Sequence, residues 1–547
     1  MKTRIWNNVK RLLIISAFLY LPALAFAQKM SADHYWISLK DKEYNEYSIN
    51  DPSEFLGPKA ISRRERFNIP VTVEDLPVSR LYSDSLASLG LKILGSSKWF
   101  NAMLVQSNDT ALLDTLNRIE FINDFSPAIE SFSTSHNESV ESDELEFNLE
   151  IEYGESYLQS NLLGGLGLHK LGYKGQGIDI AVLDAGFYMV DSFEVFRQLW
   201  DNGQIIHTHD YVNPEGDLFD ESSHGMSVLS TIAVDEPGLF IGTAPEAGFY
   251  LLRTEDAPRE NKVEEAYWVF GAEFADSAGA DIITTSLGYH SFDSTAMNYD
   301  WEDLDGNSAL VTRAAEFAFS RGMIVVASAG NEGSSRWLKV TPPADGPNVL
   351  AVGSIDTAMV VSRFSSRGNT EDGRIKPDIL AVGFETRLIN RSGQTGYGFG
   401  TSFAAPQIAG LAACLWQAMP EKTNAEIIQA IRHSANFYAN PDSIHGYGVP
   451  NFMVALWFLN AIENSSYSDE IKIYPQPFEQ EFFIMSNENI NSISIYSLSG
   501  SLEFSVTGNW QKGEIISVNP SRITQAGIYF LVTKNDQKEF VSKLIRK

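Results

Sequence analysis

The chain has 547 residues, of which 70 are acidic and 41 are basic, so its formal net charge at pH 7 is −29. This negative excess argues against nucleic acid and against an anionic membrane surface as partners. The length is sufficient for about three or four domains. Because Cys414 is the single cysteine, no disulfide can form within the chain. Its place in an apolar, helix-forming run predicts a buried thiol rather than a nucleophile.

Residues 1–27 have the pattern of a secretory signal peptide. Residues 12–24 are apolar, and Ala25-Phe26-Ala27 is a small-x-small cleavage site in front of Gln28. The basic residues that precede the apolar run are Lys2, Arg4, Lys10 and Arg11. The run is too short to span a bilayer comfortably, so the pattern predicts an exported protein.

Residues 28–136 are predicted to form a separate α+β unit. The hydrophobic pattern indicates the order strand, helix, strand, strand, helix, strand. These elements are expected at 34–39, 84–89, 91–94, 102–105, 109–119 and 121–125. This order fits a ferredoxin-like sandwich.

Residues 137–156 are predicted to be a solvated acidic linker. The stretch has no lysine or arginine, and such a composition is typical of segments that do not pack into a core. Its acidic residues are Glu138, Glu141, Asp143, Glu144, Glu146, Glu150, Glu152 and Glu155.

Residues 157–462 alternate short apolar strands with helical stretches. Strands are expected at 178–183, 249–252, 281–285, 323–328 and 348–352, and helices at 263–278 and 309–320. This alternation predicts a parallel sheet covered by helices on both sides.

Residues able to support chemistry stand at the ends of these elements. Asp184 follows the strand 178–183, at the edge where parallel sheets place ligands, whereas Asp179 stands at the beginning of the same strand. His224 begins a short helix. Ser402 begins an apolar helix, where free N–H groups favour negative charge, and Asn331 follows the strand 323–328. As alternatives, Ser402 is an ordinary N-cap and Asn331 an ordinary turn residue. The apolar helix is expected to hold Pro406 in its first turn.

Several short segments between Gly175 and Pro450 are specific in sequence. They are Asp184-Ala185-Gly186, His224-Gly225, Gly242-Thr243-Ala244-Pro245, Ser286-Leu287-Gly288, Ala329-Gly330-Asn331, Phe364-Ser365-Ser366-Arg367-Gly368 and Gly400-Thr401-Ser402. Together with the order Asp, His, Ser along the chain, they resemble the subtilisin-like serine proteases, the subtilases of the peptidase S8 family.

The resemblance implies a subtilisin-like sheet and a serine endopeptidase. In it, Ser402 attacks the peptide carbonyl, His224 is the general base and Asp184 orients the imidazole. Asn331 donates to the oxyanion together with the Ser402 N–H. The segment Ser286-Leu287-Gly288 would pair with an extended polypeptide substrate and line its primary side-chain pocket. No cofactor is expected for the chemistry, and structural calcium is possible at a site that the sequence does not identify.

The resemblance also gives the flanking regions a function. Residues 28–136 would be a propeptide that assists folding and inhibits the enzyme, the alternative being an independent binding domain. Maturation cleavage is expected within 137–156. Glycine-rich turns and alternation predict a small β-sandwich over 471–547, after a polar linker at 463–470.

The last 77 residues carry a second resemblance. Its motifs are Tyr474-Pro475-Gln476-Pro477-Phe478, Leu498-Ser499-Gly500, Gly527-Ile528-Tyr529 and the basic end Lys543-Leu544-Ile545-Arg546-Lys547. They resemble the C-terminal sorting domain of the type IX secretion system, which implies that machinery as a partner. The protein would then pass through the periplasm to the cell surface or the medium. A carbohydrate-binding or adhesive module is the alternative.

Other patterns point less clearly to chemistry. His207 and His209 lie on one face of a strand but lack a third spaced metal ligand. The stretch 300–307 is acidic but does not have the spacing of a calcium loop. Two other functions stay open, a noncatalytic adhesion protein on a protease fold and an esterase. The esterase would use Ser402 with Asp442 and His445, although only two residues separate that acid from the histidine.

Overall fold

The computed structural model describes residues 33–126 and 150–547, apart from 110, 111, 113–115, 117, 439, 464–470, 475, 476, 479, 480, 487, 499, 522, 536 and 537. The predicted signal peptide, residues 1–27, lies outside the described residues. So do most of the acidic linker 137–156 and nearly all of the linker 463–470.

The N-terminal unit is a four-stranded antiparallel sheet with helix α3. Its elements are β1 (His34–Leu39), α3 (Arg80–Ser88), β2 (Lys92–Ser97), β3 (Ala102–Gln106) and β4 (Ile122–Ser126). The strand order β2-β3-β1-β4 is that of the predicted ferredoxin-like sandwich. Ile37, Leu86, Met103 and Val105 are fully buried in its core. Most of the expected second helix, 109–119, lies outside the described residues.

One segment between β1 and α3 does not belong to this unit. Residues 47–75 group instead with the part of the chain that follows the N-terminal unit. The segment contains the short helices η1 (Pro52–Glu54) and η2 (Val73–Asp75) and the helix α2 (Pro58–Phe67). The sequence pattern did not indicate this arrangement.

The central part of the chain is built on a seven-stranded parallel sheet of order β13-β12-β11-β10-β5-β9-β6. The strands are β5 (Asp179–Asp184), β6 (Ile205–Asp210), β9 (Gly248–Arg253), β10 (Ile282–Thr285), β11 (Ile324–Ser328), β12 (Leu350–Ile355) and β13 (Ile379–Val382). Central strands such as β10 and β11 are buried at every residue, which explains their nearly continuous apolar and small sequences. The predicted covered parallel sheet is confirmed.

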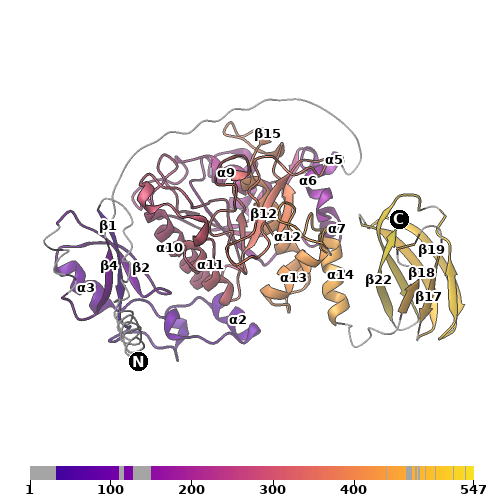
Figure 1. The fold of residues 1–547 in the computed structure, drawn as a ribbon, viewed down its shortest axis with the longest axis horizontal. Coiled ribbons are helices and arrows are strands. Elements are labelled where there is room, and N and C mark those ends of the chain that lie inside the picture. The colour runs from indigo at the N-terminus through magenta and orange to yellow at the C-terminus, as the bar shows by residue number, and fades with distance from the viewer. Residues whose placement is uncertain are drawn as a thin grey trace, which may run out of the picture. The chain divides into compact units, whose positions relative to one another are not determined.

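Helices cover both faces of this sheet (Figure 1). Ile180 and Val182 of β5 share a core with α9 (His224–Ala233) and α12 (Thr401–Ala418). On the other face Leu183 lies against Gly271 of α10 (Val263–Ala278), and α11 (Leu310–Ser320) packs beside α10 and β11. The alternation along β5 therefore divides the core into two layers.

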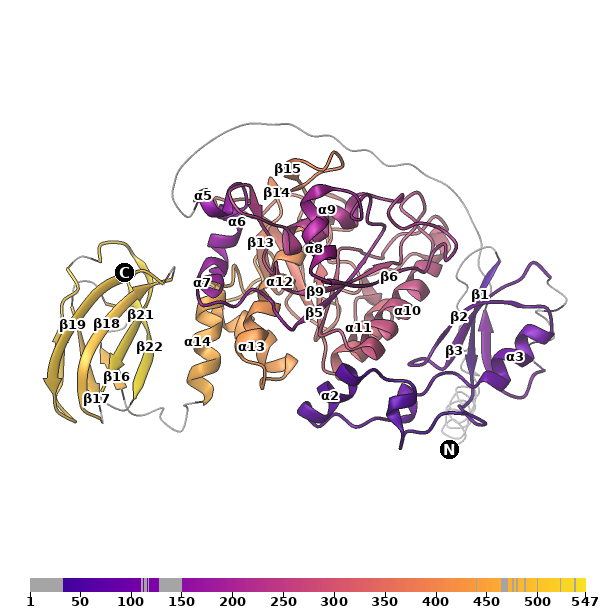
Figure 2. The same ribbon diagram turned by 180° about the vertical axis from the view of Figure 1, so that it is seen from behind.

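The remaining elements of this part are short or peripheral. They are α5 (Glu150–Tyr153), α6 (Tyr157–Leu162), α7 (Gly165–Lys170), η3 (Glu194–Phe196), α8 (Arg197–Asp201), β7 (Asp235–Glu236), β8 (Phe240–Ile241), η4 (Thr295–Met297), η5 (Trp301–Asp303), η6 (Glu332–Ser334), β14 (Thr386–Ile389), β15 (Thr395–Gly398), α13 (Asn424–Ser434) and α14 (Phe452–Glu463). Figure 2 shows several of them from behind.

The C-terminal residues form two antiparallel sheets, β16-β17-β20 and β19-β18-β21-β22. The strands are β16 (Ile471–Tyr474), β17 (Phe482–Ser486), β18 (Ile490–Ser497), β19 (Leu502–Trp510), β20 (Ile515–Val518), β21 (Gly527–Lys534) and β22 (Glu539–Arg546). Phe482 and Ile484 of one sheet share a core with Ile493 and Leu531 of the other. The predicted β-sandwich is therefore confirmed.

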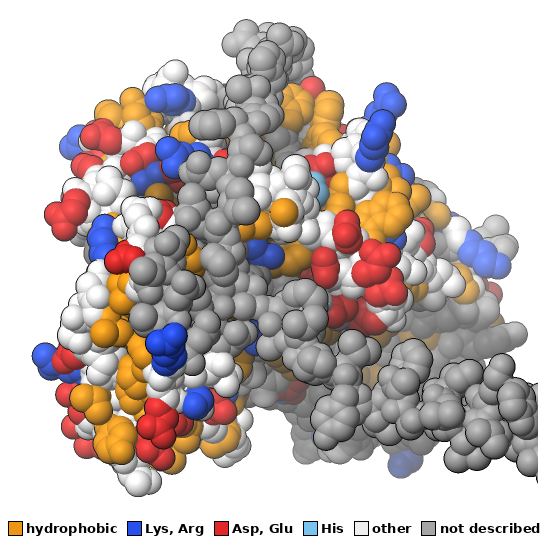
Figure 3. Space-filling view, turned by 60° about the vertical axis from the view of Figure 1, so that its left-hand side comes forward, with side chains coloured by type: hydrophobic (Ala, Val, Ile, Leu, Met, Phe, Trp, Pro, Cys, Tyr) orange, Lys and Arg blue, Asp and Glu red, His pale blue; other side chains and the backbone are white. Residues whose placement is uncertain are grey.

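The surface carries charge of both signs. In Figure 3, acidic and basic side chains are both scattered among apolar ones over the described part of the visible face. Among the described residues, no helix combines the length and the apolar character that crossing a membrane requires.

Candidate active site

Asp184 and His224 meet where β5 ends and α9 begins. The Asp184 carboxylate is fully buried, and its Oδ1 lies 2.7 Å from His224 Nδ1. The same oxygen accepts the backbone N–H of Ala185 at 2.8 Å. Two donors on one oxygen fix the orientation of the carboxylate, and the carboxylate in turn fixes the imidazole.

Gly225 makes this meeting possible. A Cβ atom at this position would lie 2.4 Å from the Gly186 carbonyl oxygen and 2.8 Å from Asp184 Cβ. Any larger residue would push the first turn of α9 away from β5. The glycine beside the histidine is thus required by packing, as well as being part of the motif.

The environment of His224 changes its acidity in two opposing ways. Burial, the largest single influence, lowers the pKa of the imidazole, but the charge of Asp184 and its hydrogen bond together outweigh burial and raise the pKa above 6.5. The side chain keeps 33% of its surface exposed, so it stays open to a substrate. A paired, accessible imidazole with a raised pKa is suited to accept a proton.

Ser402 is the second residue of α12, as predicted, and only 8% of its surface is exposed. Gly400 before the helix has φ +148°, a conformation that side-chain-bearing residues rarely adopt. The Phe403 ring lies 5.6 Å from the His224 ring between centroids, which places the imidazole beside the first turn of α12. In the described structure the Ser402 hydroxyl donates to the Ser286 carbonyl oxygen at 3.4 Å rather than to the imidazole.

Pro406 is not in the first turn of α12, contrary to expectation. The helix begins at Thr401, so Pro406 is its sixth residue and lies inside it. Its missing N–H would have bonded to the carbonyl of Ser402, four residues earlier. Ser286 Oγ donates to that carbonyl at 2.7 Å instead. Sequence analysis missed this contact, although a proline four residues after a buried serine indicates that an outside donor is needed.

Asn331 is fixed against the start of α12. Its Oδ1 accepts the Thr401 backbone N–H at 3.0 Å and the Thr401 hydroxyl at 3.1 Å. Thr401 Oγ1 also accepts the backbone N–H of Gly330 at 3.2 Å. With its oxygen held in this way, the exposed side chain presents its NH₂ group as a donor beside Ser402.

The segment Ser286-Leu287-Gly288 follows β10 directly. Gly288 is exposed, and no described residue hydrogen-bonds to the backbone of Leu287 or Gly288. A Cβ atom on Gly288 would lie 2.2 Å from Thr341 Oγ1, so only glycine fits. The backbone groups of these two residues are therefore unpaired, and an extended peptide needs unpaired backbone groups for pairing.

The other candidate residues are occupied elsewhere. Asp442 and His445 pair with each other at 2.9 Å in an exposed turn. The His207 and His209 rings stack with centroids 6.3 Å apart. In the stretch 300–307, Asp300 and Asp303 form a capping box, so this part is a turn.

Three glutamates form the only group, among described residues, whose ligand atoms are close enough to share a metal ion. Oxygen atoms of Glu255, Glu260 and Glu264 lie within 4.8 Å of one another. Burial is the main cause that raises the pKa of each carboxyl group. Repulsion within the group adds to the rise for Glu255 and Glu264, and Asp293 adds to the rise for Glu260, whose pKa is raised to about 7. The Tyr289 hydroxyl donates to Glu255 at 2.9 Å.

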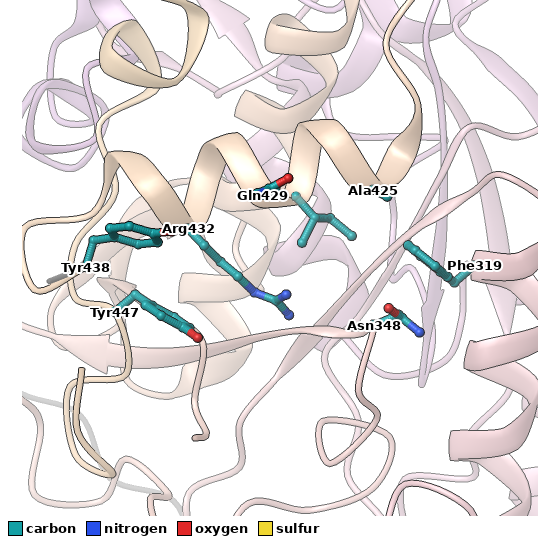
Figure 4. A pocket seen from close by; sticks show the side chains of 8 residues that line it. Phe319, Asn348, Ala425, Gln429, Arg432, Tyr438 and Tyr447 are labelled. Atoms are coloured by element: carbon teal, nitrogen blue, oxygen red, sulfur yellow. The ribbon is translucent and has the colours of Figure 1, made fainter. Parts of the chain in front are cut away.

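A cavity of about 600 Å³ opens beside α13 (Figure 4). Phe319, Asn348, Ala425, Ile428, Gln429, Arg432, Tyr438 and Tyr447 line it. None of the predicted site residues is among them. Because none of the lining residues belongs to the candidate active site, the cavity is separate from it. Arg432 on its wall is paired with Asp378 at 2.7 Å.

Family models match three regions of the chain. Residues 175–448 match the subtilase family, residues 34–144 the peptidase S8 propeptide domain of Bacteroidota, and residues 472–547 a secretion system C-terminal sorting domain. These matches confirm the subtilase and sorting-domain resemblances that the motifs indicated, and the propeptide that the first of them implied.

Individual proteins agree with these matches. Subtilisin E of Bacillus subtilis (strain 168) is 30% identical over 321 residues, which are 58% of this chain and 74% of that protein. A subtilisin of Bacillus pumilus is 30% identical over 308 residues, 56% of this chain and 98% of the other. Among solved structures, MycP1 from the ESX-1 type VII secretion system is similar at 23% identity, with 55% of this chain and 85% of that one covered and a TM-score of 0.43.

These regions together define the protein in broad outline. A C-terminal sorting domain indicates a secreted or cell-surface protein, and the propeptide match indicates a zymogen. The chain belongs to the subtilase family and is a subtilisin-like serine endopeptidase, with an N-terminal propeptide domain and a C-terminal sorting domain.

Proposed function

We propose that Ser402, His224 and Asp184 hydrolyse peptide bonds through an acyl-enzyme. The observation that carries the proposal is the 2.7 Å contact between His224 and the buried Asp184 beside the first turn of α12. Ser402 Oγ attacks the peptide carbonyl carbon while His224 Nε2 takes its proton. The contact to Ser286 that the hydroxyl must leave is long, at 3.4 Å, so breaking it costs little.

The remaining steps use the same residues. The Asn331 NH₂ group and the Ser402 backbone N–H donate to the oxyanion of the tetrahedral intermediate. The His224 imidazolium, stabilised by Asp184, then gives its proton to the leaving amine. Water enters and its oxygen adds to the acyl carbon while His224 takes a proton from it. The bond to Ser402 Oγ then breaks, His224 returns the proton to that oxygen, and the carboxylic acid is released. These are nucleophilic and acid–base steps that the side chains supply without a cofactor, and calcium is expected only as a structural ion.

The substrate is a polypeptide bound as an extended strand. The unpaired backbone of Leu287 and Gly288 would donate to and accept from the peptide on the acyl side of the cut bond. Because such pairing uses the peptide backbone, it tolerates many side chains. We therefore infer broad cleavage, in which the side-chain pocket that Ser286-Leu287-Gly288 is expected to line sets the preference.

We propose that the propeptide inhibits this site and that the chain is cut during maturation. Residues at the start of the catalytic domain limit where the cut can fall. The Glu152 carbonyl accepts the Gly238 N–H at 2.8 Å, Tyr153 is 5% exposed, and Gly154 pairs with Phe240. A protease needs an accessible, unpaired stretch of chain, so we place the cut before Glu152.

The central experiment compares the mature protein with a Ser402→Ala variant on casein. Hydrolysis by the parent and none by the variant supports the proposal. Hydrolysis of neither supports the noncatalytic adhesion alternative, and cleavage of simple esters without casein cleavage supports the esterase. Asn331→Ala should lower turnover by about 10²–10³, the loss known for the equivalent donor in subtilisin. Turnover equal to the parent's would remove Asn331 from the mechanism.

Export is tested separately. If the C-terminal sandwich is the address for the type IX secretion machinery, deletion of 471–547 should leave active enzyme in the periplasm. Unchanged export of the truncated protein would mean that the sandwich serves another purpose, such as adhesion.

A further inference from the structure

The segment 47–75 lies within the region matched as propeptide but packs on the catalytic domain. Arg63 and Arg64 of α2 are only 3% and 2% exposed. Buried arginines are rare in proteins unless they are paired. Their partners therefore show what the segment binds.

Both arginines contact one carboxylate of the catalytic domain. Arg63 Nη2 lies 2.7 Å from Asp276 Oδ1, and Arg64 Nη2 lies 2.9 Å from Asp276 Oδ2. Arg64 also contacts Asp75 at 2.8 Å, and Asp75 contacts Arg321 at 3.0 Å. Positive and negative groups thus alternate along a buried chain of ion pairs. Three members come from the segment, and two come from the ends of α10 and α11.

Arg63 also satisfies carbonyl groups at these two helix ends. Its Nε donates to the Arg321 carbonyl at 3.0 Å, and its other nitrogens donate to the carbonyls of Ala280 and Asp276. A cation at a helix C-terminus is favourable because of the free carbonyls and the helix dipole there. Two glycines let the segment come close to these helix ends. A Cβ on Gly279 would lie 2.6 Å from Lys59, and a Cβ on Gly322 would lie 2.8 Å from Ile69.

A second cation fixes the segment to the sheet. Lys59 Nζ lies 2.7 Å from Asp179 Oδ2 and 2.5 Å from Asp281 Oδ2. Asp179 begins β5 and Asp281 precedes β10, whereas Asp184 ends β5 and Ser286 follows β10. Over the six residues of β5 these two edges are about 17 Å apart.

The segment therefore binds at the edge of the sheet opposite to the active site. Figures 1 and 2 both show α2 at the other end of the catalytic domain from α9. From this position the segment cannot block the substrate strand. Its buried ion pairs must serve something other than occupation of the cleft.

We propose that residues 47–75 are a docking clamp that keeps the cleaved propeptide on the catalytic domain through a site of its own. The chain continues from the clamp at Asp75 directly into the four-stranded unit. As long as the clamp is bound, that unit stays tethered, at an effective concentration in the millimolar range for short flexible connections. One cut in the linker would then not release the inhibitor. This rests on the proposed maturation cut, but the test below does not depend on the enzyme's own activity.

The test uses the full chain with Ser402→Ala, which prevents self-processing. A recognition sequence for a site-specific protease is placed within 137–149, the chain is cut, and the products are separated by gel filtration at micromolar concentration. The N-terminal fragment should elute with the catalytic body. Its separate elution from the parent protein would overturn the proposal.

Charge-matched variants show which site holds the fragment. Arg63→Ala/Arg64→Ala should release at least ten times more fragment than the parent. Lys40→Ala/Arg80→Ala removes the same charge from exposed positions of the four-stranded unit and should release no more than the parent. Retention of the fragment by the Arg63/Arg64 variant would mean that the four-stranded unit alone holds it, and the clamp would be rejected.

A milder variant covers the case in which the double variant does not fold. Lys59 lies at the rim of the site, with 36% of its side chain exposed, so Lys59→Met should leave the fold intact. We expect several-fold more release from this variant, with an unchanged circular dichroism spectrum. Release equal to that of the parent would count against the clamp.

Discussion

The bond between Ser286 and Ser402 gives a prediction about how the nucleophile is held. A helix residue normally donates its N–H to the carbonyl four positions earlier, but Pro406 has none to give to Ser402. Ser286 Oγ supplies the bond at 2.7 Å. Ser286→Ala removes this donor and leaves the carbonyl of Ser402, a residue that is 8% exposed, without a partner.

The expected magnitude follows from the burial of this carbonyl. A buried acceptor left without a donor costs about 1–3 kcal/mol, so Ser286→Ala should lower the free energy of unfolding by that amount. Pro406→Ala restores the N–H of the helix itself. In that background Ser286→Ala should cost less than about 1 kcal/mol, which makes the coupling between the two sites about 1–2 kcal/mol.

The assay is a double-mutant cycle in urea. All four proteins carry Ser402→Ala, which stops self-digestion and retains the backbone carbonyl. Unfolding can be followed by tryptophan fluorescence, since Trp416 lies in α12 and is 3% exposed. If Ser286→Ala costs the same with proline and with alanine at 406, the hydroxyl does not replace the missing N–H and the reasoning is refuted.

Three further predictions concern protons and processing. Because Asp184 raises the pKa of His224 above 6.5, activity should rise with pH through a midpoint above 6.5; Asp184→Asn should lower that midpoint in a pH profile and cut turnover by about 10⁴. Burial lowers the pKa of His169 to about 4. As the pH falls, this imidazole therefore takes up a proton in the unfolded chain before it does so in the folded one. Stability measured in urea should fall by about 3 kcal/mol between pH 6.5 and 4, and less in His169→Gln. N-terminal sequencing of the mature enzyme should find its first residue at or before Glu152, and any later start would contradict the pairing seen there.

Much of the fold could be predicted because burial imposes a period on the sequence. The helix expected at 263–278 is observed as Val263–Ala278, since its apolar residues recur at helical spacing over four turns. The strand before Asp184 was found because β5 is buried from Ile180 onward. The candidate site could be proposed because polar residues stand where apolar strands end or helices begin. These residues are Asp184, His224 and Ser402.

The clamp could not be predicted, for a physical reason. Helix α2 has the sequence PKAISRRERF, which looks like a solvated surface helix because charged residues are usually exposed. Its arginines are buried only because Asp276 lies more than 200 positions later in the chain. Nothing local to either residue indicates such a pair.

The two edges of the sheet show why the chemistry and the clamp can vary independently. The interiors of β5 and β10 are apolar or uncharged and buried, so charged side chains are tolerated only at their ends, where they can find partners. At the carboxyl edge Asp184 orients an imidazole, and at the amino edge Asp179 and Asp281 bind Lys59. A change at the amino edge should therefore alter retention of the propeptide without moving the pH profile. A change of Asp184 should move the pH profile without altering retention of the propeptide, because the rigid strands between the edges have no titratable group to couple them.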